Sequence, residues 1–256
     1  MLEKLKKIFN SNQSQNIESS SIIGRKTNQE DCFYISESKN NQRLVFVADG
    51  VGGHSHGEFA SNKTVEIFNE AFSHISEKEI IPDFLRNTAY QAARAVLEQG
   101  NQDNEYKNCG TTISGFFITG NAYYTINIGD SRVYLWNCQT LCRETHDHSI
   151  VQQLIDSGQI TEAEAFTHPK RNIMTSAIGQ DLAMMKIDIQ GPRNLEHGDI
   201  LMAFSDGVHD ALTDEQIFQI VKHYQNTQGL ADALTTAAYN VGGKDNITAV
   251  IYRFFE

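Results

Sequence analysis

The sequence has few cysteines and no long apolar segment, and each shortage excludes a class of protein. Only four cysteines occur in 256 residues: Cys32, Cys109, Cys138 and Cys142. Cys138 and Cys142 flank an expected turn, but no second pair completes a zinc site. We therefore expect reduced structural thiols, which favour a cytoplasmic protein over a disulfide-rich secreted one. No apolar run reaches the roughly 18 residues that a membrane helix needs, so no membrane span is expected.

Positive charge is also in short supply. Lys and Arg total 21 against 32 Asp and Glu, which gives a net charge of −11. An acidic chain repels a nucleic-acid backbone, and no basic stripe reverses this locally, so we expect no nucleic-acid partner. The acidity is typical of an ordinary soluble surface, and it also fits a protein that stores carboxylates for cations. A hydrophobic content of 40% allows a sizeable core.

The first 20 residues are expected to form a flexible tail, because residues 11–21 are polar and linker-like. Apolar residues at helical spacing within residues 1–10, with lysines between them, could instead form a weak basic helix at a membrane surface. We assign this segment no function. Residues 21–256 are expected to form a single domain.

Two apolar runs resemble each other and predict strands that are buried on both faces. Residues 44–48 (LVFVA) are followed by Asp49 and Gly50, and residues 200–204 (ILMAF) are followed by Ser205, Asp206 and a glycine. Each run therefore delivers a carboxylate to the end of a core strand. The glycine after it lets the backbone turn sharply or approach a ligand closely.

The remaining periodic segments predict an α+β fold. Further strands are expected over residues 32–36, 111–118, 122–128, 132–136, 184–189 and 247–254. Helices are expected over residues 58–74, 82–99, 149–157, 214–225 and 230–240. Strands come in runs and the long helices come in pairs, which does not favour alternating βαβ units. We expect two antiparallel sheets packed together, with helix pairs outside them.

Acidic residues gather at the ends of these predicted strands. They are Glu30, Asp31, Asp49, Asp130, Asp206 and Asp245. Several carboxylates that converge on one site repel each other strongly unless cations neutralise them. Oxygen ligands alone select hard ions such as Mg²⁺ or Mn²⁺ over zinc. Any one Asp-Gly pair could merely mark a turn, which is its commonest use, and only the joint occurrence favours a metal site.

Five segments that carry these residues resemble a known family in their order along the chain. They are residues 24–31 (GRKTNQED), 47–54 (VADGVGGH), 129–132 (GDSR), 205–207 (SDG) and 243–248 (GKDNIT). Together they resemble the bacterial type 2C metal-dependent Ser/Thr protein phosphatases across roughly residues 21–254. The resemblance implies a four-layer α-β-β-α sandwich of two antiparallel sheets flanked by helix pairs, with a two-metal site at one end.

The resemblance also implies how the carboxylates divide between two Mg²⁺ or Mn²⁺ ions. Asp49 bridges both ions. Asp206 and Asp245 complete one side, and Glu30 with the Gly50 carbonyl serves the other.

Further roles follow from the same resemblance. Asp31 acts through a water, and Asp130 together with Asp206 matches the place where bacterial members bind a third ion. Asn246 is expected to orient its neighbouring ligand. A water held between two cations becomes a strong nucleophile near neutral pH. The implied activity is hydrolysis of phosphoserine and phosphothreonine in proteins by a monomeric enzyme that reverses a Ser/Thr kinase.

Three positions depart from the family pattern. Lys26 stands where the family usually has Arg, with Arg25 one place earlier; either could hold the phosphate, Lys26 as a point charge. Ser176 stands where many bacterial relatives carry Arg. Val51 replaces the histidine that follows Asp-Gly in eukaryotic members. His54 is therefore the candidate proton donor, and a metal-bound water is the alternative.

Two other functions compete with this hypothesis. A catalytically weak pseudophosphatase could act as a binding module, although the full acidic set argues against it. An unrelated two-metal hydrolase such as a nuclease is disfavoured by the net charge of −11.

Residues 149–179 resemble the flap subdomain of bacterial relatives. They are predicted to form a small lid that influences which phosphoprotein enters; a rigid surface segment without this role is the alternative.

Overall fold

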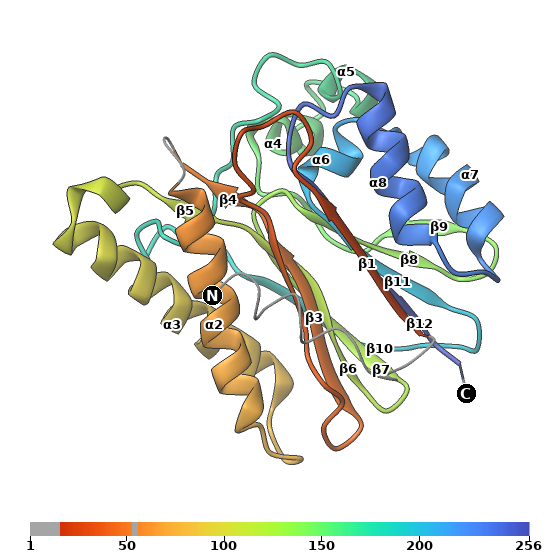
Figure 1. Ribbon diagram of the computed structural model, residues 1–256, viewed down its shortest axis with the longest axis horizontal. Helices are drawn as coiled ribbons and strands as arrows, with labels where there is room; N and C mark the ends of the chain where they lie inside the picture. Colours follow the sequence, from red (N-terminus) through yellow and green to blue (C-terminus); the bar gives the residue numbers. More distant parts are fainter. Residues whose placement is uncertain (1–15, 53–55, 256) are drawn as a thin grey trace.

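Two antiparallel sheets, each with five strands, form the centre of the molecule in the computed structural model, which describes residues 16–52 and 56–255. The sheets pack face to face, and helices cover the outer face of each (Figure 1). This arrangement confirms the predicted α-β-β-α sandwich. Within the described ranges, no helix is long and apolar enough to cross a membrane.

The first sheet joins the two chain ends of the domain. In spatial order its strands are β1 (Ile17–Ile22), β12 (Ile247–Arg253), β11 (Ile200–Phe204), β8 (Arg132–Trp136) and β9 (Leu141–Arg143). Its outer face is covered by α6 (Asp206–His209), α7 (Asp214–Tyr224) and α8 (Leu230–Val241). Helix α7 begins with a capping box, in which the side chains of Thr213 and Gln216 each bond the other's backbone N–H.

The second sheet carries the long helix pair. In spatial order its strands are β10 (Asp188–Asn194), β7 (Ala122–Ile128), β6 (Ile113–Thr119), β3 (Gln42–Ala48) and β2 (Cys32–Ile35). The helices on its outer face are α2 (Gly57–Ser73) and α3 (Ile81–Gln102). A two-stranded ribbon of β4 (Gly50–Val51) and β5 (Gly110–Thr111) extends this half, and the 3₁₀ turn η1 (Asn104–Tyr106) follows α3.

Strand alternation divides the apolar residues among three buried layers. In β3, Leu44 and Phe46 face the α2–α3 pair, whereas Val45 and Val47 face the other sheet. Strand β11 also has two buried faces: Met202 packs against α7 and α8, and its neighbours Leu201 and Ala203 face the other sheet. Both faces of these strands are therefore buried, which explains why their sequences are continuous apolar runs and not alternating ones.

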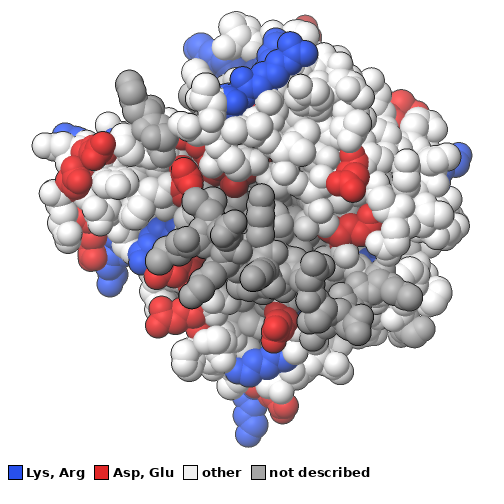
Figure 2. All heavy atoms as spheres, in the orientation of Figure 1, with Lys and Arg blue, Asp and Glu red and all other residues white. Residues whose placement is uncertain are grey.

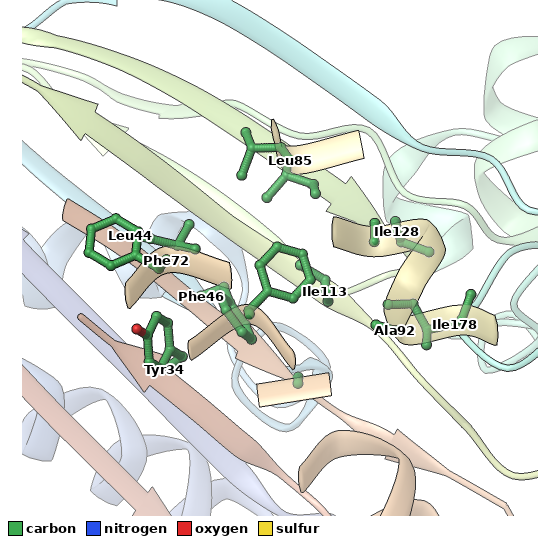
Figure 3. Packing of buried hydrophobic residues seen from close by; sticks show 14 of the residues in the cluster. Tyr34, Leu44, Phe46, Phe72, Leu85, Ala92, Ile113, Ile128 and Ile178 are labelled. Carbon is green, nitrogen blue, oxygen red and sulfur yellow. The ribbon is translucent and has the colours of Figure 1, made fainter. Parts of the chain in front are cut away.

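The layer between the second sheet and its helices is rich in aromatic rings (Figure 3). The Phe46 ring lies 5.4 Å from the Tyr34 ring and 5.1 Å from the Phe68 ring, measured between centroids. Ala92 on α3 and Ile178 belong to the same cluster. Ile178 lies near the end of the 149–179 segment, so this segment is attached to the main core at that point.

The 149–179 segment contains two short helices, α4 (Ile150–Asp156) and α5 (Glu162–Ala165). Two isolated bridges hold its ends, one between Ser149 and Met174 and one between Thr111 and Ile178. Most of its side chains from residue 157 to 175 are exposed or half-buried.

Two predicted boundaries are wrong. The tail expected over residues 1–20 is contradicted from Ile17 onward, because β1 pairs along its whole length with β12. The rest of that prediction, over residues 1–15, lies outside the described residues. Strand β1 was not predicted because its serines give no apolar pattern; it lies at the edge of its sheet and has exposed polar residues. The strand expected over residues 184–189 starts later, at Asp188, and Met184 is 73% exposed. Strand β10 has mainly polar, exposed residues, so it lacks the apolar pattern by which strands are recognised.

Replacing Phe46 tests the core facing α2 and α3. The side chain is fully buried between two rings, so Phe46→Ala should lower the free energy of unfolding by about 3–5 kcal/mol. Chemical denaturation provides the measurement, with Met184→Ala as an exposed control that should cost less than about 0.5 kcal/mol. Similar losses for the two variants would contradict this packing.

Candidate active site

Strand register brings the predicted carboxylates to one end of the two sheets. Cys32 pairs with Ala48, so Asp31 and Asp49 lie together at the end of β2 and β3. In the other sheet Phe204 pairs with Ala249 and with Arg132. Asp206 therefore lies near both the start of β12, which carries Asp245, and the hairpin turn that carries Asp130.

Asp49 and Asp206 are the most perturbed of these groups. Burial raises the pKa of Asp49 well above its usual range, and the neighbouring carboxylates, chiefly Asp206 and Asp31, raise it further. Burial likewise raises the pKa of Asp206, with Asp130 as the largest neighbouring charge. The two sheets thus bring like charges together where water is excluded, which is costly without a counter-charge.

Asp31 lies beneath these groups and is held by two hydroxyls. Its Oδ2 accepts hydrogen bonds of 2.7 Å from Ser205 Oγ and of 2.7 Å from Thr248 Oγ1. Burial raises the pKa of Asp31 to about 6, and the two hydroxyls offset part of that effect. The carboxyl is therefore fixed in orientation between β2 and the first sheet.

Asp245 pairs with Lys26 at the rim. The Lys26 Nζ lies 2.9 Å from Asp245 Oδ1, with 44% and 39% of the two side chains exposed. Burial opposes the charge of Lys26, but the hydrogen bond and charge of Asp245 outweigh it and raise the Lys26 pKa. Arg25 is exposed, and its backbone N–H donates to the Gly243 carbonyl oxygen over 2.7 Å. Both candidate phosphate-binding residues, Arg25 and Lys26, therefore lie on one loop beside the start of β12.

Asn246 fastens this loop to the strand. Its Nδ2 donates to the carbonyls of Ile23 and Asn28, each over 2.9 Å, and its Oδ1 accepts from Glu30 N–H over 2.8 Å. Its own N–H donates to Asp245 Oδ1 over 2.9 Å. Asn246 therefore orients the neighbouring carboxylate and also the whole loop that bears Lys26 and Glu30.

Glycines permit the close approach of these backbones. A Cβ at Gly24 would lie 1.9 Å from the Asp245 carbonyl oxygen, and one at Gly207 would lie 1.9 Å from the Asn246 carbonyl oxygen. A Cβ at Gly50 would lie 2.3 Å from the carbonyl oxygen of Gly57, the first residue of α2. These positions exclude every side chain, so the glycines beside the acidic residues are required by packing.

Glu30 lies next to the first turn of α2, although it comes from a different part of the chain. Burial raises the pKa of its carboxyl, and Lys26 and the Gly57 N–H partly offset this. The Gly50 N–H donates to the Glu30 carbonyl over 3.2 Å, and Ser61 Oγ donates to the same oxygen over 2.6 Å. The helix start, the β4 turn and the Glu30 loop are thereby linked.

Asp130 lies on the opposite side of the group, in the turn between β7 and β8. Burial raises its pKa to about 7, with contributions from Asp147 and Asp210. Thr112 connects this turn to Asp49: its Oγ1 accepts from the Asp49 N–H over 2.9 Å and lies 2.7 Å from Ser131 Oγ.

Three buried oxygens in this group have no hydrogen-bond partner within the described structure: Glu30 Oε1, Asp31 Oδ1 and Asp206 Oδ1. Such atoms are rare in folded proteins and indicate an unsatisfied interaction. The donors here are all oxygens, as hard divalent cations prefer. Within residues 16–52 and 56–255, no three His, Cys, Asp or Glu side chains already form a compact ligand cage. The residues fit divalent cations in chemistry and burial.

The structure thus brings together most of the predicted residues of the described chain, namely Lys26, Glu30, Asp31, Asp49, Gly50, Asp130, Asp206 and Asp245. Arg25 lies exposed on the neighbouring loop, where only its backbone contact with Gly243 is defined. His54 lies outside the described residues and stays a prediction. The sequence reasoning missed the hydroxyls of Thr112, Ser131, Ser205 and Thr248. Ser131, Ser205 and Thr248 lie within the motifs 129–132, 205–207 and 243–248, which was the one signal for them, whereas Thr112 lies outside every motif.

The raised pKa values predict how pH affects stability. A carboxyl whose pKa is raised by folding stabilises the protein below its unfolded pKa, about 3.9 for Asp, and loses that contribution as pH rises through the folded value. For Asp31 and Asp130 the loss extends to about pH 6 and about pH 7. The difference in unfolding free energy between protein with Mn²⁺ and protein in chelator should therefore widen from about pH 5 to about pH 7.5. Chemical denaturation measures it, and a constant difference would contradict the shared burial of these groups.

Comparison with known proteins identifies the family. A family model described as protein phosphatase 2C matches residues 19–238. The chain is 30% identical to a serine/threonine phosphatase stp of Listeria monocytogenes over 220 residues, covering 85% of this chain and 86% of that protein. It is 34% identical over 232 residues to a putative protein phosphatase 2C-type protein of Streptococcus pyogenes, covering 90% and 93% respectively.

Solved structures share the fold. The S. agalactiae serine/threonine phosphatase superposes with a TM-score of 0.83 at 33% identity and covers 93% of this chain and 99% of its own. The catalytic domain of the phosphatase PstP in complex with two manganese ions gives a TM-score of 0.79 at 26% identity, over 94% and 98% of the two chains. The resemblance carried by the five sequence motifs is confirmed, and the chain belongs to the protein phosphatase 2C family.

Proposed function

We propose that the chain hydrolyses phosphoserine and phosphothreonine in proteins with the help of bound Mg²⁺ or Mn²⁺. The observation that carries this proposal is the buried set of carboxylates with three unpartnered oxygens at one end of the sheets. Family membership supports the reaction, and the manganese-bound PstP relative supports the metal. The completeness of the acidic set speaks against a pseudophosphatase.

The proposed ligands divide as the motifs imply. Asp49 lies between Asp206 and Asp31 and is the candidate to bridge two ions. Asp206 and Asp245 serve one ion, and Glu30 with the Gly50 carbonyl serves the other. When bound, the cations supply the Lewis acidity that activates water and stabilises negative charge on the phosphoryl oxygens.

Asp31 and Asp130 are proposed to lie outside the direct ligands of the two ions. Asp31, with Oδ2 committed to two hydroxyls, has only Oδ1 to offer and suits an indirect role through a water. Asp130 lies beside Asp206 and could share a third ion with it.

The chain's own positive groups orient the phosphate. Lys26 is half exposed at the rim and its ammonium is directed toward Asp245, with Asp206 and Glu30 also contributing to its raised pKa. We assign to Lys26 the contact with the phosphoryl oxygens, as a point charge, with Arg25 beside it on the loop held by Asn246. His54 remains the predicted donor of a proton to the leaving oxygen. A phosphoprotein and its Ser/Thr kinase are the proposed partners of a monomeric enzyme.

Metal-dependent turnover tests the proposal. The purified protein should hydrolyse an aryl phosphate and phosphothreonine peptides in Mn²⁺ or Mg²⁺, and chelator should abolish both activities, because it removes the cations that activate water in the proposed reaction. Initial rates across a series of metal concentrations give the measurement. Turnover that persists in chelator, or no turnover with any metal, would refute the proposal.

Substituting Asp206 separates catalysis from stability. Asp206→Asn removes a proposed ligand charge, so kcat/KM should fall at least roughly 100-fold. In chelator the same change relieves repulsion from neighbouring carboxylates, so the free energy of unfolding should rise by roughly 1–2 kcal/mol. Asp232→Asn, an exposed change on α8, is the control that should alter neither property. Loss of activity together with loss of stability in chelator would assign Asp206 a structural role instead.

A further inference from the structure

A second feature adjoins the carboxylate site. A cavity of about 310 Å³ lies between the 149–179 segment and the helices α6 and α7. Figure 1 shows α4, α5 and α6 gathered at the same end of the sandwich. Asp130 and Asp206 both form part of the cavity wall. A group bound in the cavity would therefore lie within a few residues of a phosphoresidue at the carboxylate site.

Carboxylates outnumber guanidinium groups in the cavity wall. The acidic residues are Asp130, Asp147, Glu162, Asp206, Asp210 and Asp214, and the arginines are Arg132, Arg143 and Arg171. Without the proposed metal ligands Asp130 and Asp206, the acidic residues of the wall still outnumber its arginines.

Two of the three arginines have hydrogen-bond partners in the cavity wall, but only Arg132 is neutralised by a carboxylate. The guanidinium of Arg132 donates to both oxygens of Asp147, with distances of 2.7 to 3.1 Å. Arg143 donates to the neutral Gln152 Oε1 over 2.9 Å. Of the remaining acids, Asp210 faces Arg171 across 3.3 Å.

The last two acids lack a guanidinium partner in the cavity wall. Asp214 accepts a hydrogen bond from the neutral Tyr134 hydroxyl over 2.8 Å. Glu162 is exposed in the first turn of α5. Their charges are thus available to a cation that enters from outside.

His209 provides an independent indication of a ligand. The residue is 5% exposed, it contributes to the cavity wall, and neither ring nitrogen has a hydrogen-bond partner within the described part of the chain. Its Nδ1 lies 3.8 Å from Asp210 Oδ1, which is beyond hydrogen-bond distance. A buried imidazole without partners is costly. One of its nitrogens can accept a hydrogen bond from an N–H donor beside Asp210.

Apolar side chains form the other wall. Val151 and Ile155 come from α4, Phe166 follows α5, and Leu212 follows α6. Long basic side chains place their methylene stems on such surfaces and direct their charged ends to polar groups. The cavity therefore combines an apolar wall with an acidic end and an unpartnered imidazole.

We propose that this cavity binds an arginine or lysine side chain of the phosphoprotein substrate, close in sequence to the phosphoresidue. The inference rests on the proposed phosphatase function and specifies its substrate class. The excess of negative charge over the whole chain favours the approach of basic segments. On the face seen in Figure 2, Lys and Arg occur in a few groups, the longest of them at the upper edge, with uncharged and acidic surface between them.

Matched phosphothreonine peptides test the proposal. Three peptides differ only near the phosphoresidue, where they carry Arg, Gln or Glu. Wild type is compared with the double variant Glu162→Gln with Asp214→Asn, which removes the two acids that lack a guanidinium partner. A control double variant, Glu98→Gln with Asp232→Asn, makes the same charge change at exposed positions on α3 and α8. The readouts are kcat/KM in Mn²⁺ and peptide affinity by fluorescence anisotropy in chelator.

Wild type and the control should prefer the Arg peptide over the Gln peptide by roughly fivefold in both readouts. The preference should fall below about twofold in the Glu162 and Asp214 variant, with aryl phosphate turnover unchanged. Equal treatment of the Arg and Gln peptides by wild type, a preference for Glu, or a preference that survives the double variant would each overturn the proposal. Absence of aryl phosphate turnover would instead refute the phosphatase function, and the anisotropy measurement would still decide whether the cavity binds a basic side chain.

Discussion

Electrostatic repulsion among buried carboxylates is the constraint on which the active end of this protein depends. Asp49 directly follows β3, and Asp206 follows β11 after one residue. Both strands are buried on both faces, so the packing of the two sheets forces the two groups together. Burial and mutual repulsion raise the pKa values of both. A fold that is otherwise held by apolar layers therefore has a site that is unfavourable in the absence of cations, and this cost is what makes the site bind them.

The surrounding structure holds these groups in place against that repulsion. Thr112 connects the Asp49 backbone to the turn of Asp130, and Ser205 and Thr248 fix Asp31. Asn246 binds the loop of Lys26 and Glu30 at three backbone positions. These are neutral donors and acceptors, which can orient charged residues without adding to the charge of the site. The arrangement explains why hydroxyl and amide side chains are as necessary here as the acids.

Much of this could be predicted from the sequence, and the failures have physical causes. The strands that end in Asp49 and Asp206 were predictable because burial on both faces requires continuous apolar runs. Strands β1 and β10 were missed or displaced because they lie at sheet edges, where exposed positions accept serine, glutamine and arginine. The motifs predicted which acids belong together. They could not predict the cavity beside α6, since its wall combines residues from distant segments, and His209 has no neighbour in sequence that distinguishes it.

Calorimetric titration of the metal-free protein with Mn²⁺ at about pH 6, in buffers of different ionisation enthalpy, tests the central claim most directly. The pKa of Asp31 is raised to about 6 and that of Asp130 to about 7, and burial also raises the pKa values of Asp49 and Asp206 well above their usual range. At about pH 6, Asp130 therefore largely holds its proton and Asp31 does so in part before the ions bind. The account predicts binding of at least two ions per chain with a net release of protons, and smaller release for Asp206→Asn. Binding without proton release, or no binding, would contradict it.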